Sequence, residues 1–206
     1  MTKSITKVIA ALGVVAGLGV AVLPLSSYAD SKDVTVQITI EATTGTVNPG
    51  CTTASDSGGA GEIIEADCSM TGSSNTGVKI SIADKDSNLN LVGNQSPTPE
   101  NIPALSATAN LSDAQFDPAN LGTSVPSGGA WGFKFVVGAS TNLTTQGNYG
   151  NWNGITASDV VVAQSPNATV GVDMAGSKFS FRAVTPPSQA PGIYTDVVVV
   201  TVDTLP

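Results

Sequence analysis

Residues 33–41 read Asp-Val-Thr-Val-Gln-Ile-Thr-Ile-Glu, a stretch in which apolar and polar side chains alternate without a break. Successive side chains of a β-strand point to opposite sides, so the apolar residues at positions 34, 36, 38 and 40 share one face. The pattern predicts a strand with one face in a core and the other in solvent.

The same alternation recurs along the chain. It is found in Val78-Lys79-Ile80-Ser81-Ile82, Trp131-Gly132-Phe133-Lys134-Phe135 and Phe179-Ser180-Phe181-Arg182. Beyond residue 30 no segment has helical periodicity over three turns, and the only helical candidate is a short turn at Ser112 to Gln115. Clusters of Gly, Ser, Asn and Pro at 55–61, 93–99, 124–129 and 185–192 predict loops. The sequence therefore predicts an all-β fold, an antiparallel β-sandwich with long loops.

The last apolar segment, residues 193–202, differs from the others. Val197 to Val200 is continuously apolar, which is typical of a strand covered on both faces. We expect this segment to lie in the middle of a sheet.

The first 29 residues have the pattern of a secretory signal peptide. Lys3 and Lys7 precede an uncharged apolar run, and Ser27-Tyr28-Ala29 places small residues at the cleavage positions. We expect residues 1–29 to be removed and residues 30–206 to form a single β-sandwich domain without a membrane span. The alternative is a retained transmembrane anchor, since the apolar run has about the minimum length for a bilayer.

The charge balance limits the partners. The chain has 8 basic and 16 acidic residues, and removing Lys3 and Lys7 leaves a net charge of −10. Binding to nucleic acid needs clustered Lys and Arg, so nucleic acid is excluded as a partner. The signal peptide predicts a secreted or cell-surface location. Together with the negative charge, it favours a cell-envelope component, a glycan or a surface protein as partner.

The chain has two cysteines, Cys51 and Cys68. In an exported protein an isolated pair is expected to form a disulfide bond. A metal site built on these cysteines lacks further ligands, because the chain contains no histidine.

One segment resembles the first half of an EF-hand loop. Oxygen-bearing side chains stand at alternate positions: Asp84, Asp86, Asn88 and Asn90. Two requirements of a calcium loop fail, because Leu89 replaces the turn glycine and Gln95 replaces the bidentate glutamate. We therefore expect no cofactor and a simple Asx-rich turn, with calcium binding by these four residues as the alternative.

Two aromatic residues lie in a loop rich in glycine and asparagine, at Tyr149 and Trp152. If exposed, they offer flat faces that stack on a sugar ring or anchor a protein partner. The alternative is that Trp152 folds back over the edge of the sandwich.

The chain lacks the residues of the common catalytic sites. Without histidine the usual general base is missing, and both cysteines are expected to be paired. Glu62, Glu65, Asp84 and Asp86 offer carboxylates for glycoside hydrolysis, but nothing in the sequence places two of them across a cleft. We expect that the protein is not an enzyme.

Four segments have a pattern that is known from other proteins: Val78 to Asp86, Ile102 to Ser106, Trp131-Gly132-Phe133 and Pro191 to Val202, the last with a Gly-x-Tyr-x-Asp start. They resemble secreted bacterial surface proteins of the WxL-domain family and related pilin-like or spore-coat-U-like sandwiches. The resemblance implies an immunoglobulin- or pilin-like sandwich displayed outside the cell. The WxL motif itself is absent, because neither Trp131 nor Trp152 is followed by x-Leu. The resemblance therefore does not support attachment to peptidoglycan by a WxL motif.

Together these observations predict a secreted cell-surface protein with a structural or adhesive role and no catalytic activity. One alternative is a carbohydrate-binding module. The other is a pilus subunit that self-associates by donor-strand exchange, in which residues 33–41 would join the open sheet edge of a neighbouring copy.

Overall fold

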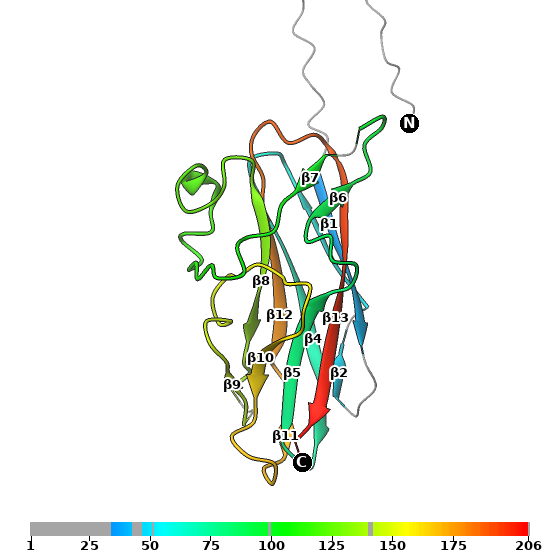
Figure 1. The fold of residues 1–206 in the computed structure, drawn as a ribbon, viewed down its shortest axis with the longest axis vertical. Helices are drawn as coiled ribbons and strands as arrows, with labels where there is room; N and C mark the ends of the chain where they lie inside the picture. The colour runs from blue at the N-terminus through cyan, green and yellow to red at the C-terminus, as the bar shows by residue number, and fades with distance from the viewer. Residues whose placement is uncertain (1–33, 43–46, 51, 99, 140–141, 206) are drawn as a thin grey trace, which may run out of the picture. The chain divides into compact units, whose positions relative to one another are not determined.

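Two β-sheets face each other (Figure 1). An apolar core lies between them. The structure is a computed structural model and describes residues 34–42, 47–50, 52–98, 100–139 and 142–205. The predicted signal peptide, residues 1–29, and Cys51 lie outside the described residues. The all-β prediction is confirmed, and the arrangement is a β-sandwich.

The first sheet contains eight strands. Its order is β3 (Thr53–Gly58), β1 (Val34–Ala42), β13 (Gly192–Thr204), β5 (Val78–Asp84), β10 (Val160–Gln164) and β9 (Thr144–Thr145), and β6 (Leu91–Gly93) joins β13 to β7 (Asn101–Ile102). Among the described strands, every pairing is antiparallel except the one between β1 and β13. Strand β1 therefore lies inside the sheet of its own chain, between β3 and β13.

The second sheet contains five strands. Its order is β11 (Val172–Asp173), β4 (Ile63–Ser74), β12 (Lys178–Val184) and β8 (Ala130–Val136), with β2 (Val47–Pro49) beside β4. One short 3₁₀-helix, η1 (Pro118–Asn120), lies in the long connection between β7 and β8. The helical turn expected at Ser112 is present as a single turn, because the N–H groups of Gln115 and Phe116 both donate to the Ser112 carbonyl.

The core follows from the alternation in the sequence. The even-numbered residues of β1 and β5 and the odd-numbered aromatics of β8 and β12 are buried between the sheets. Burying this apolar surface is the main favourable term in folding. The largest buried side chains include Trp131, Phe133, Phe135, Phe179 and Phe181.

Strand β13 lies in the middle of its sheet, as predicted, with β1 on one side and β5 on the other. The expectation that both of its faces are covered is not met. Val198 and Val200 are buried, whereas Val197 and Val199 are only partly covered. The strand therefore alternates like the others, and its inward row runs through Tyr194, Asp196 and Val198.

Two long loops cover the edge and part of the outer face of the second sheet, and we call them the covering loops, residues 103–129 and 146–159. They pair with β8 through reciprocal hydrogen bonds of Phe133 with Asn153 and through the bonds of Leu105 and Pro103 to Trp131. Gly132 and Gly154 permit this contact, because a Cβ at either position would lie within 2.5 Å of a backbone carbonyl oxygen. The edge of β8 is thus closed against pairing with other chains.

Candidate functional site

Three carboxylates meet where β5 ends beside β13, and we call them the Asp84 cluster: Asp84, Asp86 and Asp196. One ligand oxygen from each lies within 4.8 Å of the others. Asp84 ends the inward row of β5, and Asp196 lies in the inward row of β13. The strand register explains the contact, because Val198 pairs with Asp84 and Asp196 is the next inward residue along the same strand.

The loop after β5 is folded around the Asp84 side chain. Its Oδ1 accepts hydrogen bonds from the backbone N–H groups of Asp86 and Ser87, and Asp86 Oδ1 accepts one from the N–H of Asn88. Ser87 has a positive φ of 67°, which few residues other than glycine adopt. The Asx-rich turn expected from the sequence is therefore present.

Two of the three carboxylates are buried and only half satisfied. Asp84 is 4% exposed and Asp196 is 6% exposed, while Asp86 is exposed. Asp196 Oδ1 accepts a hydrogen bond from the N–H of Val197, 2.7 Å away. The second oxygens of Asp84 and Asp196 are buried and have no hydrogen-bond partner in the part of the chain that the structure describes.

The pKa values of Asp84 and Asp196 are both raised, which favours the neutral form of each carboxyl group. Burial, together with the negative charges of Asp84 and Asp86, raises the pKa of Asp196 to about 8, against the lowering effect of the hydrogen bond from the Val197 N–H. Burial also raises the pKa of Asp84, partly offset by the hydrogen bonds from Ser87 and Asp86. Like charges in a poorly solvated place disfavour ionisation.

The four residues singled out in the sequence divide into two pairs. Asp84 and Asp86 belong to the cluster, whereas the amide of Asn90 donates to Asn88 Oδ1 at 3.1 Å, so these two side chains bind each other. Asp196 was missed by the sequence analysis. Its signal was the period-two pattern of β13, which places this acid in the same row as Tyr194 and Val198.

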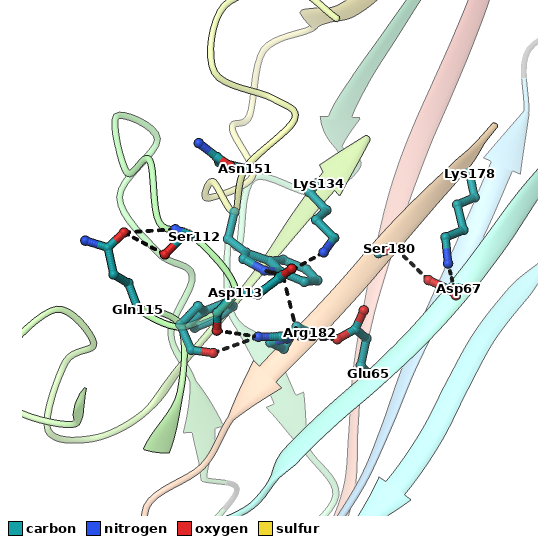
Figure 2. Close-up of polar contacts among 12 residues, drawn as sticks. Glu65, Asp67, Ser112, Asp113, Gln115, Lys134, Asn151, Lys178, Ser180 and Arg182 are labelled. Atoms are coloured by element: carbon teal, nitrogen blue, oxygen red, sulfur yellow. Dashed lines mark hydrogen bonds and ion pairs between the residues drawn. The ribbon is translucent and has the colours of Figure 1, made fainter. Parts of the chain in front are cut away.

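A second group of charged residues lies on the outer face of the second sheet (Figure 2). We call it the Arg182 network, and its members are Glu65, Asp113, Lys134, Trp152 and Arg182. Arg182 donates from Nε and Nη2 to Glu65 and from Nη1 to the carbonyls of Asp113 and Phe116. The guanidinium thereby ties one covering loop to β12 and β4.

The Asp113 carboxylate is the anionic centre of this network (Figure 2). Its Oδ1 accepts from Lys134 Nζ and from Trp152 Nε1, each at 2.7 Å. The hydrogen bonds from Lys134 and Trp152 hold the pKa of Asp113 below its usual value of 3.8. The charged groups of Lys134 and Arg182 each lie 4.5 Å from the centre of the Trp152 ring, in cation–π contact.

The two loop aromatics have different environments. Trp152 is fully buried and packs on Phe116 with ring centres 5.5 Å apart. Trp152 thus folds back onto the sandwich, which was the alternative expectation, and the Trp152 ring has no exposed face for a partner. Tyr149 is partly exposed and stacks on Phe133 with ring centres 5.8 Å apart. Of the two proposed contact residues, only Tyr149 is accessible.

The predicted disulfide involves Cys51, which lies outside the described residues, and its partner Cys68 is fully buried in β4. The preceding segment runs along β4, since Pro49 pairs with Met70 and the Gly50 N–H donates to the Ser69 carbonyl. The bond itself stays a prediction.

Other predictions concern membranes and self-association. Within the described part of the chain, no helix is long and apolar enough to cross a membrane. Donor-strand exchange would require β1 to leave the place that it occupies between β3 and β13. That alternative also stays a prediction.

Neither protein-family models nor curated proteins match this chain. The resemblance to WxL-domain and pilin-like sandwiches rests on the chain's own residues.

Proposed function

We propose that this protein is a secreted cell-surface protein with a structural or adhesive role and no catalytic activity. The observation that carries the proposal is the way in which the sandwich fixes its covering loops. Preorganised loops on a rigid scaffold favour binding, because little conformational entropy is lost when a partner is bound.

The covering loops have an apolar core of their own. Leu105, Phe116 and Val125 from the loops pack against Trp152 and against Ala130 and Val184 of the second sheet. The Arg182 network then closes the polar side of the same contact. Large loops that are held by both apolar and charged contacts are suited to presenting a surface of fixed shape.

The exposed side of these loops is mostly polar and uncharged. Exposed residues between 106 and 129 are mainly Ser, Thr, Asn, Gln, Gly and Ala, with Asp113 as one of the few charges. Such a surface suits hydrogen bonding with a glycan or a surface protein, and the net negative charge opposes binding to nucleic acid. The resemblance to WxL-domain and pilin-like proteins supports the same class of function.

Cell fractionation tests the proposal. We expect the protein in the envelope or the culture fluid, with Asp30 as its first residue and with no free thiol, since we propose a Cys51–Cys68 disulfide. N-terminal sequencing and thiol counting on the unreduced protein measure both. A full-length, reduced product in the cytosol would overturn the proposal.

A second candidate is a carbohydrate-binding module, which is favoured by the partial exposure of Tyr149 beside the polar loops. A glycan array with the purified protein and its Tyr149→Ala variant tests it. Glycan binding that is lost in the variant, with an unchanged melting temperature, would favour the module over a structural role. Binding by neither protein would leave the structural role as the better proposal.

A further inference from the structure

Among the described residues, each buried carboxylate of the Asp84 cluster has hydrogen-bond donors for only one of its two oxygens. One oxygen of Asp84 and one of Asp196 are satisfied by backbone N–H groups, and no group in the described ranges donates to the other two oxygens. Both residues are more than nine-tenths buried. Unpaired buried polar atoms are rare in proteins, and buried charges are normally paired or bound to a metal ion.

The spacing of the oxygens fits a single cation. Two oxygens on the same calcium ion lie at most about 5 Å apart, twice the Ca–O distance of about 2.5 Å. The three ligand oxygens of the cluster lie within 4.8 Å of one another, which satisfies this limit. Magnesium, with bonds of about 2.1 Å, would hold them within about 4.2 Å and prefers to keep its waters.

We propose that Asp84, Asp86 and Asp196 bind one calcium ion where β5 ends beside β13. The ligand type agrees, because calcium prefers carboxylate oxygens and accepts irregular geometry. Exposed Asp86 leaves the site open to solvent, so the ion has a route of entry. The remaining positions would be filled by water and backbone carbonyls.

A bound ion would fasten the loop after β5 to the centre of the first sheet. Asp84 and Asp86 belong to this loop and its preceding strand, whereas Asp196 belongs to β13, more than 100 residues later. The same loop is tied to the second sheet, because Trp131 Nε1 donates to the Leu89 carbonyl at 3.0 Å. Calcium would therefore stabilise a junction between β5, β6 and β13.

The competing occupant is a proton shared between Asp84 and Asp196. Two ionised carboxylates cannot donate to each other, so either a proton or a cation must lie between them when they are buried together. The two occupants differ in their response to calcium. A proton pair needs no metal, whereas a calcium site gains stability as the ion concentration rises.

The test uses the purified protein and two variants at pH 7. Melting temperatures are measured in EDTA, in about 10 mM CaCl₂ and in about 10 mM MgCl₂, and calcium affinity is measured by calorimetry. Asp196→Asn removes one buried carboxylate and keeps its shape. Asp203→Asn is the matched control, because it removes an acid from the same strand that lies outside the cluster, in a surface pair with Lys79.

We expect calcium to raise the melting temperature of the wild type and of Asp203→Asn by about 3–10 °C, for the affinity of about 10⁻⁴–10⁻³ M that is typical of extracellular modules. Magnesium should raise it less. Asp196→Asn should melt near the wild-type temperature in EDTA, because a neutral amide of the same shape replaces the carboxyl group, and should lose the calcium response.

Two results would overturn the calcium site. One is a wild-type protein whose melting temperature and calorimetry are unchanged by calcium, which would assign a shared proton to the pair. The other is a calcium response that Asp196→Asn retains in full, which would place the ion elsewhere.

Discussion

The Arg182 network and the Asp84 cluster both bury charge in the same sandwich, but they compensate it differently. In the Arg182 network, two cations and two carboxylates bind one another and the backbone (Figure 2). In the Asp84 cluster, three acids meet, and two buried oxygens have no hydrogen-bond partner among the residues that the structure describes. The pKa of Asp113 is lowered in the first region and that of Asp196 is raised in the second.

The two regions differ in whether the chain itself supplies the opposite charges. The Arg182 network contains both signs, whereas the Asp84 cluster contains only acids. A network whose charges cancel internally holds loops in place and needs nothing from outside. A cluster of one sign is stable only with a proton or a cation supplied by the solution. The first region is therefore complete within the chain, whereas the second needs either a shared proton or the calcium ion that we propose.

The largest effect is expected from removing the aromatic centre of the Arg182 network. Trp152→Ala should lower the free energy of unfolding by about 3–5 kcal/mol, because a fully buried aromatic side chain is replaced by a cavity. Urea denaturation measures it. Hydrogen exchange should show the loss of protection concentrated in residues 103–129, which pack on this ring.

Trp152→Phe is the control for this variant. It keeps most of the ring and loses the hydrogen bond to Asp113, so about 1–2 kcal/mol should be lost. If Trp152→Ala were as stable as the wild type, the covering loops would not depend on this contact.

A smaller loss is expected from removing the buried cation. Arg182→Met should cost about 2–3 kcal/mol, since two carbonyls and Glu65 lose their donor. The value lies below that of a fully buried pair, because the side chain of Glu65 is 30% exposed and regains water. Urea denaturation of the purified variant measures the difference.

Lys178→Met is the matched control for Arg182→Met. Lys178 lies on the same strand and pairs with Asp67, but both side chains are more than one-third exposed. Such surface pairs contribute about 0–1 kcal/mol. Equal losses in the two variants would show that burial does not distinguish the two ion pairs.

Most of the strands that the sequence predicted alternate between apolar and polar residues, but the alternating strand β4 was missed, although its Ile64, Ala66, Cys68 and Met70 are all buried. Residues 33–41 gave β1 almost to its ends, because four apolar residues at even spacing leave one choice of face. The Thr53–Gly58 segment was expected to be largely loop and is strand β3. Only its Ala54 is fully buried, and it pairs with β1 as an edge strand, which its own composition does not indicate.

The candidate site was predictable in part. The sequence marked Asp84 and Asp86, and the alternation of β13 would have placed Asp196 facing inward. The pairing of β5 with β13 joins strands that are far apart in the chain, so the sequence could not show that these acids meet. Trp152 is similar, since the residues that cover it, such as Phe116 and Arg182, are about 30 or more positions away.

The two regions should also differ in how low pH changes the free energy of unfolding, and Asp113 allows this to be measured. Its pKa is lowered in the folded state, so its stabilising effect is complete above the unfolded value of 3.8 and is lost as the pH falls through the folded value. The stability difference between wild type and Asp113→Asn should therefore be largest near pH 7 and shrink below about pH 4. Urea titrations at several pH values measure it, and a difference that is independent of pH would contradict the assignment.

The smallest effect is expected where the sequence suggested metal ligands that the structure pairs with each other. Asn88→Ala and Asn90→Ala remove a hydrogen bond between two side chains of an outer loop, so each should change the free energy of unfolding by no more than about 0.5 kcal/mol. Their calcium response should equal that of the wild type, because neither is among the three acids that converge. Since Asn88 follows Asp86 by only two residues, a calcium response that disappears in Asn88→Ala would extend the ligand set along the loop and return the site to the EF-hand-like pattern of the sequence.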